Sequence, residues 1–155
     1  MKEFKIEDKE IFMMLTSKQV SLIAEKGKVR NYEPGEIIYD FKAIAKDIFF
    51  LLEGEVSLRL PGKKDQTPEF FSYEIESIKN RGVFGPGRLF GVERYLTRAR
   101  AVKRSKVLSI DADLFMKIMK QEKSELVVMS YLAGVYFQRY INTMKELQLH
   151  LVDKT

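Results

Sequence analysis

The sequence predicts a mainly β protein with flanking helices, and two patterns support this fold class. Residues 31–110 contain short apolar or alternating segments at intervals of about ten residues, the rhythm of an all-β sandwich or barrel. Residues 1–30 and 111–152 carry apolar residues at helical spacing instead. A chain of 155 residues buries roughly two thirds of its unfolded surface, so we expect residues 1–155 to form one domain.

Residues 1–30 are expected to form short helices. A helix over 16–26 would have Thr16 or Ser17 as its N-cap and Gln19 in the first turn. Its apolar residues share one face: Val20, Ile23 and Ala24. Gly27 suits the left-handed position that follows many helices. A further helical turn is indicated by Ile6, Ile11, Phe12 and Leu15.

The β region, residues 31–110, begins with a Pro34-Gly35 turn that leads into a strand over 37–39. Residues 48–52 are continuously apolar, which indicates a strand covered on both faces. A turn over 53–55 separates it from 56–60, where apolar and polar residues alternate, so one face is buried and the other is wet. Residues 61–69 form a surface hairpin loop, and a half-buried strand follows with Phe71, Tyr73 and Ile75 on its buried face.

The C-terminal helices are expected to occupy residues 111–152. Asp111 is the N-cap of the first, whose apolar residues keep helical spacing: Leu114, Phe115, Ile118 and Met119. The second helix runs from about Glu125 to Leu151, and its first half, LVVMSYLAGVYF, is apolar nearly all round. This half must therefore be covered on more than one side.

Two faces of the second helix have different expected roles. Val128, Leu132 and Val135 can lie on the β region. A neighbouring seam steps by four and three residues, as in a coiled coil: Met129, Ala133, Tyr136, Tyr140, Thr143 and Leu147. We favour a homodimer through this seam over a single, fully buried helix.

The stretch from Gly82 to Ile110 combines glycine turns with positive charge. It opens with Gly82, Gly85, Pro86, Gly87 and Gly91, and residues 81–106 hold eight basic side chains against Glu93, a net +7 in a chain of net +5. Backbone N–H groups and arginine forks are the usual donors to phosphate. Either an anion site or a barrel corner with solvated basic residues fits this composition.

Composition limits the function classes. The chain has no cysteine, which excludes thiolate catalysis, zinc fingers and disulfide frameworks. No signal peptide or membrane span is expected, so a cytoplasmic protein is the natural interpretation. The single histidine, His150, fits a helix-end cation better than a general base. Since no base, nucleophile or metal cluster stands beside the arginines, we do not expect an enzyme.

Several segments together resemble a known family: PGEIIYDF, DIFFLLEGEVSLRL, GPGRLFG, the Arg-Ala pair in LTRARAV, and VLSIDADLFMKIM before a long helix. In this order they are similar to the cyclic-nucleotide-binding domain of catabolite-activator-type transcription factors and protein kinase A regulatory subunits. The resemblance covers roughly residues 16–147. It implies an eight-stranded β jelly roll with a long C-terminal helix.

The resemblance also implies a ligand site, which is expected at Gly87, Phe90, Gly91, Val92, Glu93, Arg98, Ala99 and Arg100. In the family, a Glu after Phe-Gly holds the ribose 2′-hydroxyl and a following Arg pairs with the cyclic phosphate. Here Val92 occupies the carboxylate position, and Glu93 comes one residue, about 100° of helix, later. Either Arg98 or Arg100 matches the phosphate arginine. Phe41-Lys42-Ala43 stands where the family commonly has a glycine turn.

Three functions remain open. The protein is a module for an anionic ligand other than cAMP or cGMP, a working cyclic-nucleotide receptor, or a ligand-free scaffold for a protein partner. No cofactor is expected beyond a cyclic nucleotide or other phosphate-bearing ligand. The family's transcription factors continue into a helix-turn-helix, and only eight residues follow Leu147 here, so we do not expect direct DNA binding. Tyr136 or Tyr140 is expected to reach the pocket from the helix as a lid, so that ligand and dimer seam form one switch.

Overall fold

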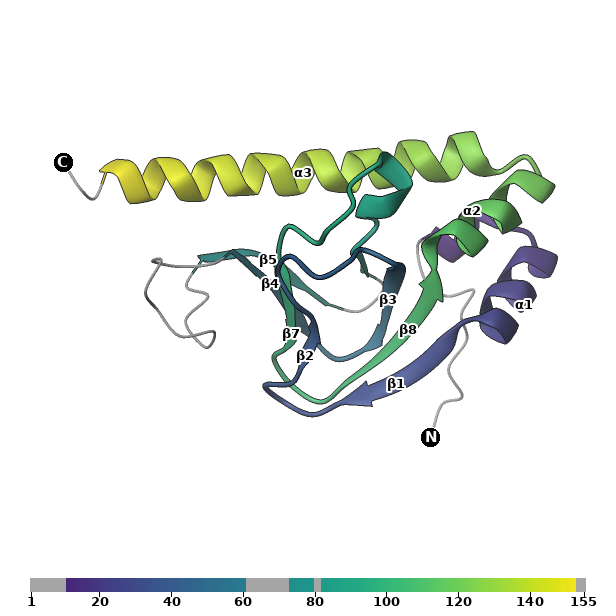
Figure 1. Cartoon of the computed structure of the whole chain (residues 1–155), viewed down its shortest axis with the longest axis horizontal. Coiled ribbons are helices and arrows are strands. Elements are labelled where there is room, and N and C mark those ends of the chain that lie inside the picture. Colours follow the sequence, from purple (N-terminus) through teal and green to yellow (C-terminus); the bar gives the residue numbers. More distant parts are fainter. Residues whose placement is uncertain (1–10, 61–72, 80–81, 153–155) are drawn as a thin grey trace.

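The computed structural model describes residues 11–60, 73–79 and 82–152. The predictions for the loop over 61–69, for Ile6 and for Phe71 lie outside these residues. The described strands form two four-stranded antiparallel sheets, and helices cover one end and one side of them (Figure 1). The fold class is therefore confirmed as a mainly β jelly roll with flanking helices and a long C-terminal helix.

The first sheet has the strand order β1 (Lys28–Tyr32), β8 (Ser105–Asp111), β3 (Asp47–Glu53) and β6 (Val83–Phe84). The second has the order β2 (Ile37–Tyr39), β7 (Arg98–Ala101), β4 (Val56–Leu60) and β5 (Tyr73–Ile78). Non-consecutive strands are neighbours in both sheets, so residues far apart in sequence are brought together. The strands predicted at 37–39, 48–52 and 56–60 are confirmed.

β3 explains why one strand of this fold is apolar throughout. Ile48, Phe50 and Leu52 face a core cluster shared with the helices, whereas Phe49 and Leu51 face a second cluster between the two sheets. Successive side chains of a strand point to opposite faces, so a strand between two cores needs an apolar residue at every position. The continuous apolar run in the sequence is the direct trace of this placement.

β4 departs from the predicted alternation at one residue. Ser57 was expected on a wet face, but it is only 3% exposed. Its hydroxyl donates to the carboxylate of Glu74 on the neighbouring β5, at 2.6 Å. The paired strand therefore covers Ser57 and satisfies its hydroxyl group, which the sequence of β4 alone cannot reveal.

β1 has no apolar signature, and the sequence pattern does not predict it. Four of its residues are exposed and only Tyr32 is buried. The strand lies at the edge of its sheet, where pairing with β8, from Lys28 opposite Ser109 to Tyr32 opposite Ser105, fixes it. An edge strand ordered by its backbone ladder does not need the alternation from which buried strands are recognised.

Gly27, which joins the first helix to β1, has a different role from the one expected. Its φ of −79° is not left-handed, so that prediction is wrong. A Cβ atom at this position would lie 2.7 Å from Leu108 Cδ1 and 2.8 Å from the carbonyl oxygen of Ile23. Close approach of the helix end to β8, and not backbone conformation, therefore requires glycine here.

The N-terminal helices are the 3₁₀ helix η2 (Ile11–Met14) and α1 (Ser17–Lys26). Thr16 is the N-cap of α1: its hydroxyl accepts from the Gln19 N–H at 3.2 Å, and its own N–H donates to Gln19 Oε1 at 3.0 Å. This reciprocal capping box confirms the predicted start of the helix.

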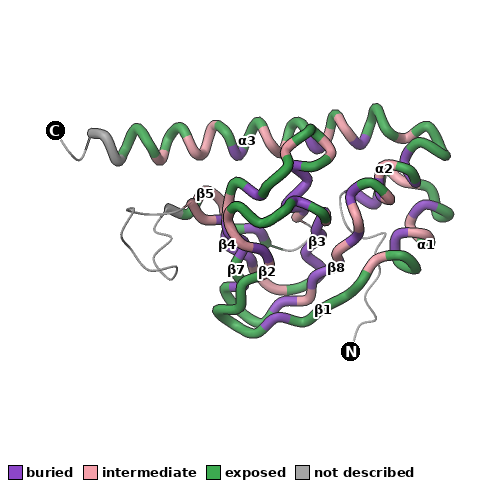
Figure 2. The backbone as a smooth tube through the Cα atoms, viewed as in Figure 1, coloured by how far each residue is buried: buried purple, intermediate pink, exposed green. Residues whose placement is uncertain are grey.

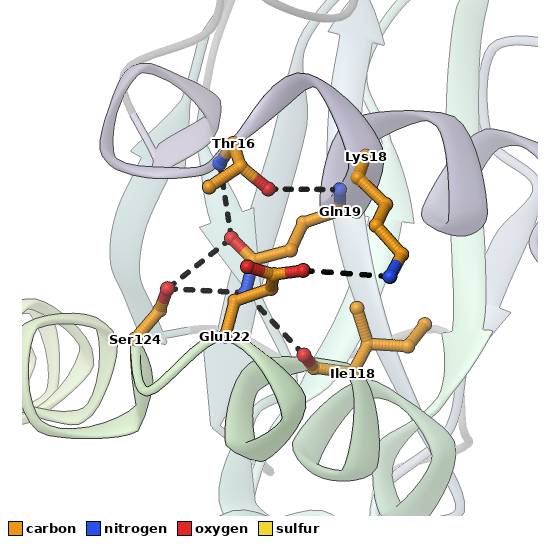
Figure 3. A network of polar contacts seen from close by, with 6 residues as sticks. All are labelled: Thr16, Lys18, Gln19, Ile118, Glu122 and Ser124. Atoms are coloured by element: carbon orange, nitrogen blue, oxygen red, sulfur yellow. Dashed lines mark hydrogen bonds and ion pairs between the residues drawn. The ribbon is translucent and has the colours of Figure 1, made fainter.

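Gln19 also links α1 to the C-terminal helices (Figure 3). Its amide Nε2 donates to the carbonyl of Ile118 at 3.3 Å and to Ser124 Oγ at 3.0 Å. Gln19 is fully buried, and its polar atoms are satisfied by two segments about a hundred residues away. The Gln19 side chain thus caps α1 and also holds it against the helix that contains Ile118 and the start of the last helix, which follows Ser124.

α2 (Ala112–Gln121) and α3 (Glu125–Val152) complete the chain. Asp111 accepts from the Leu114 N–H at 3.0 Å, which confirms it as the N-cap of α2. α3 lies across the jelly roll, with its buried positions in the half nearer α2 and at Arg139 (Figures 1 and 2). Val128 and Leu132 are fully buried in the helix-side core, which confirms the face predicted to contact the β region. In the ranges described, no helix combines the length and apolarity needed to cross a membrane.

Candidate ligand-binding site

A cavity of about 670 Å³ lies between the second sheet, the loop from β6 to β7, and α3. The sheets and the segment before β3 contribute Tyr39, Ala45, Leu58, Leu60 and Ile75. The loop contributes Gly85, Gly87, Phe90, Val92 and residues 94–97, and α3 contributes Ala133, Tyr136, Phe137, Arg139, Tyr140 and Thr143. The walls are mostly apolar and rich in aromatic rings, as in many small-molecule sites.

Stacked aromatic rings form the base of the cavity. The Tyr39 and Tyr95 rings are parallel within 21°, with centroids 3.9 Å apart. The Tyr95 hydroxyl donates to the Asp47 carbonyl at 2.8 Å, and the Tyr39 hydroxyl shares a hydrogen bond with Thr97 Oγ1 at 3.2 Å. Burial raises the pKa of both phenols, so they remain protonated at neutral pH.

Gly85 allows the loop to pass directly over these rings. Its φ of +69° is left-handed, and a Cβ atom would lie 3.0 Å from the Phe49 ring and 3.2 Å from the Tyr39 ring. Conformation and space both require glycine at this position.

The following 3₁₀ helix, η3 (Gly87–Phe90), leads into a rim that is paired with the segment before β3. The Lys42 N–H donates to the Tyr95 carbonyl and the Tyr95 N–H donates to the Ala43 carbonyl, each at 2.9 Å. Lys42 has a left-handed φ of 71°, so the turn for which the family uses glycine is kept here by a lysine. These bonds hold the rim residues 93–95 in place.

Tyr136 closes the cavity from α3. Its ring contacts Phe90 with centroids 5.3 Å apart, and its hydroxyl lies 2.7 Å from where a Cβ atom on Gly87 would be. Desolvation raises the pKa of Tyr136 to about 12, so the hydroxyl is a hydrogen-bond donor at neutral pH. The residue predicted as a lid therefore lines the cavity, and its contact with a ligand stays a prediction.

A family model for the cyclic nucleotide-binding domain matches residues 29–122, which span the jelly roll, the cavity loop and α2. The chain belongs to this family. The match stops before α3, so the helix wall of the cavity lies outside the matched range. No curated protein matches the chain significantly.

Solved structures of this family have the same fold. A putative cyclic nucleotide-binding protein from Geobacter metallireducens GS-15 is 20% identical with a TM-score of 0.66, covering 92% of this chain and 95% of that one. The Thermus thermophilus catabolite activator protein is 19% identical with a TM-score of 0.69, covering 90% of this chain and 62% of that one. The sensor domain of the transcriptional regulator DNR from Pseudomonas aeruginosa is 18% identical with a TM-score of 0.71, covering 87% and 88%. At these identities the likeness speaks for the fold alone.

Not all of the predicted site residues line the cavity of this cyclic nucleotide-binding domain. Gly87, Phe90 and Val92 do, together with Ala133, Tyr136 and Tyr140 of α3. The cavity lining does not include Gly91, Glu93, Arg98, Ala99 and Arg100, nor Met129 and Leu147. Val92, for which the resemblance implies a carboxylate, is part of the apolar wall, and Glu93 is exposed.

Both arginines that match the family's phosphate arginine are bonded to protein groups outside the cavity. Arg98 is 5% exposed and donates from Nε to Asp40 Oδ1 at 2.9 Å and from Nη2 to Asp40 Oδ2 at 3.1 Å. Arg100 is exposed, and its Nε donates to the Gly35 carbonyl at 3.2 Å. That either arginine contacts a phosphate stays a prediction.

Two other arginines line the cavity, Arg94 and Arg139, and neither is among the predicted site residues. Arg94 donates from Nη1 to the Lys42 carbonyl at 2.9 Å, and Arg139 donates from Nε to the Glu76 carboxylate and from Nη2 to the Val83 carbonyl. Arg139 continues the buried helix face of Val128, Leu132 and Val135, four residues after the last of them. A charged residue on the buried face of a helix predicts a buried partner, so the position of Arg139 could have been recognised from the sequence.

The cavity lining contains no acidic residue among the described parts of the chain. In the same parts, no three His, Cys, Asp or Glu side chains are grouped to hold a metal ion. The site can therefore hold a ligand by apolar contact with its walls, by a hydrogen bond from the Tyr136 hydroxyl and by an ion pair with Arg94.

Proposed function

We propose that this cyclic nucleotide-binding domain is a non-enzymatic regulatory module that responds to a ligand other than cAMP or cGMP. The observation that carries the proposal is the cavity lining: Val92 stands where the resemblance implies a ribose-binding carboxylate, and no lining residue is acidic among those described. A lost charge-assisted hydrogen bond costs about 1.5–3 kcal/mol, one to two decades in affinity.

The arrangement of Arg98 supports the same conclusion. Its guanidinium already forms a bidentate pair with Asp40, so turning it toward a cyclic phosphate would first break two charge-assisted bonds. A cyclic nucleotide would therefore bind at the expense of an existing ion pair.

A working cyclic-nucleotide receptor is the second candidate, and Arg94 is the observation in its favour. Arg94 lines the cavity and uses one N–H on the Lys42 carbonyl, which leaves other guanidinium donors for a phosphate. In that case Arg94, and not Arg98 or Arg100, would be the phosphate contact.

Signal transmission is proposed to pass through α3 to a second copy of the chain. α3 carries an exposed apolar line with coiled-coil spacing, and its first two residues also line the cavity: Phe137 (63% exposed), Tyr140 (59%), Met144 (39%) and Leu147 (44%). Ala133 lies on the same line, one step before Phe137. The seam predicted from the sequence shares Ala133, Tyr140 and Leu147 with this line, whereas the Tyr136 ring contacts Phe90.

Calorimetry at pH 7 with cAMP and cGMP tests the ligand proposal. We expect affinities weaker than micromolar, and we expect Val92→Glu to strengthen cyclic-nucleotide binding by restoring a carboxylate at the cavity wall. Val102→Glu is the matched control, because Val102 is 47% exposed and lies outside the cavity lining. Sub-micromolar affinity of the unaltered chain for either nucleotide would overturn the proposal in favour of the receptor.

A further inference from the structure

We propose that the cavity takes an apolar organic acid, with an aromatic or hydrocarbon body held inside and a single carboxylate at Arg94. The inference rests on the proposed function, since it names the class of ligand that would replace a cyclic nucleotide. Its support comes from the walls, the size and the charge of the cavity.

The walls favour an apolar body over a nucleotide. Leu58, Leu60 and Ile75 face the cavity from the sheet, and Phe90, Tyr136 and Phe137 face it from the loop and α3. The Tyr39 and Thr97 hydroxyls bond each other, which uses one of their two hydroxyl protons. A ribose would find no carboxylate among the described lining residues to accept from its hydroxyls, which disfavours its binding, whereas apolar surface removed from water favours binding.

The size of the cavity suits a compact ligand of two or three rings. Its volume of about 670 Å³ lies in the usual range for small-molecule sites. Two aromatic pairs in the lining, Tyr39 with Tyr95 and Phe90 with Tyr136, offer ring surfaces to a flat aromatic molecule.

Charge places the acid group at the rim. Arg139 is paired with Glu76, so it adds little net charge to the interior. Arg94 is exposed and keeps guanidinium donors beyond the one bonded to Lys42, and no carboxylate lines the cavity among the described residues. An anionic group near Arg94 stays partly hydrated, which avoids the cost of burying a charge completely.

Tyr136 supplies a second polar contact. Its hydroxyl forms no hydrogen bond with any residue that the structure describes, and it points at η3 beside the cavity. A ligand acceptor at this point would satisfy a half-buried donor that is otherwise without a bond.

A pair of dyes distinguishes the contribution of the apolar rings to binding from that of the negative charge. 8-Anilinonaphthalene-1-sulfonate and N-phenyl-1-naphthylamine share three rings, and only the first carries an anion, which stands in for the carboxylate. Titrated into the full chain with fluorescence detection, both dyes should bind saturably at one site per chain. cAMP should not displace either of them.

Two arginine variants test the position of the acid group. Arg94→Gln should weaken the sulfonate dye about tenfold, the loss expected for one charge-assisted bond, and leave the neutral dye within about twofold. Arg100→Gln should leave both dyes unchanged, because Arg100 belongs to the same basic stretch but does not line the cavity. Arg94→Lys should recover part of the sulfonate affinity.

Two further variants locate the body of the ligand. Leu60→Glu places a carboxylate in the apolar wall and should weaken both dyes at least tenfold. Met144→Lys alters the exposed line of α3 and should change neither. Circular dichroism melting of each variant establishes that it folds, so that a lost site is distinguished from a lost fold.

The inference is overturned if Arg94→Gln affects both dyes equally or neither. It is also overturned if Met144→Lys abolishes binding, since the dyes would then lie on the surface of α3. Failure of both dyes to bind, together with weak cAMP binding, would refute this inference and leave the proposed function standing. Tight cAMP binding with displacement of the dyes would refute both.

Discussion

Asp40 and Arg98 form a pair in which one partner is buried and the other half-exposed. The Arg98 side chain is 6% exposed and that of Asp40 48%. The pKa of Asp40 lies below its usual value. The main cause is the hydrogen bonding from Arg98, and the Phe41 N–H, which donates to Asp40 Oδ1 at 2.7 Å, adds to it. A carboxylate whose pKa is lowered by folding stabilises the protein above its unfolded pKa, near 4, and loses that contribution as pH falls through the lower folded pKa.

We predict that Asp40→Asn lowers the free energy of unfolding at pH 7 by about 1–3 kcal/mol, because a bidentate charged pair is lost. Urea titrations at pH 7, 5 and 3 should show the difference from the unaltered chain shrinking below about pH 4. Asp113→Asn is the control: Asp113 is also bidentate to an arginine, Arg88, but its side chain is 69% exposed, so its change should be much smaller. A difference that stays constant from pH 7 to pH 3 would contradict the assignment.

The arginines of the basic stretch show how far a sequence identifies a site. Clustered arginines beside glycine turns located the cavity loop, but not the arginine that lines the cavity. Two things decide which arginine lines the cavity. Within β7 the strand phase buries Arg98 and Ala99 and exposes Arg100, and the arginine that lines the cavity, Arg94, lies before the strand. A β-strand's phase follows from its pairing with β4, where Arg98 is opposite Arg59, and not from its own residues.

Among the elements, α1 depends on Gln19 for its position. We predict that Gln19→Ala lowers the free energy of unfolding by about 1–3 kcal/mol, because the Ile118 carbonyl and the Ser124 hydroxyl lose a buried donor. Chemical denaturation measures this loss. Hydrogen exchange should show that Gln19→Ala, compared with the unaltered chain, speeds amide exchange more in residues 17–26 than in β3.

Lys18→Ala is the matched control for Gln19. Lys18 is on the same helix, but its ion pair with Glu122 spans 3.6 Å and its side chain is 72% exposed, so its removal should change stability by less than about 0.5 kcal/mol. Equal effects of the two substitutions would mean that Gln19 acts only through helix propensity.

Helix ends and buried strands of this chain could be read from sequence, because their signals are local. Thr16 and Asp111 cap the helices as their residue types predict, and β3 is apolar at successive positions. β1 and Gly27 could not be read in this way. Their conformations are set by β8, about eighty residues later, through backbone pairing and close approach.

For the whole molecule, we predict a symmetric homodimer through the exposed line of α3. Sedimentation at tens of micromolar should give a species of twice the 18.1 kDa chain mass. Ala133→Glu should dissociate it by placing a charge between apolar side chains. Gln138→Glu makes the same charge change on another side of α3 and should leave the dimer intact.

A monomer at that concentration would refute the dimer. The exposed rings of Phe137 and Tyr140 would then be available to a ligand in the cavity or, under the scaffold hypothesis, to a different protein. That residues 1–155 form one domain also stays a prediction, which the two cores joined through β3 support.

Arg139 is the last buried residue of α3 among those whose side chains are described. Its fastening to Glu76 and Val83 lies near the middle of a helix whose later half extends past the sheets (Figure 1). From Arg139 to Val152 the helix is about 20 Å long, so a bend of about 10° at Arg139 would displace the far end by about 3 Å while Val128 and Leu132 stay in the core. We expect a movement of Tyr136 against Gly87 that bends α3 at Arg139 to be largest at the far end of the helix, so the position of Arg139 sets how far that end moves.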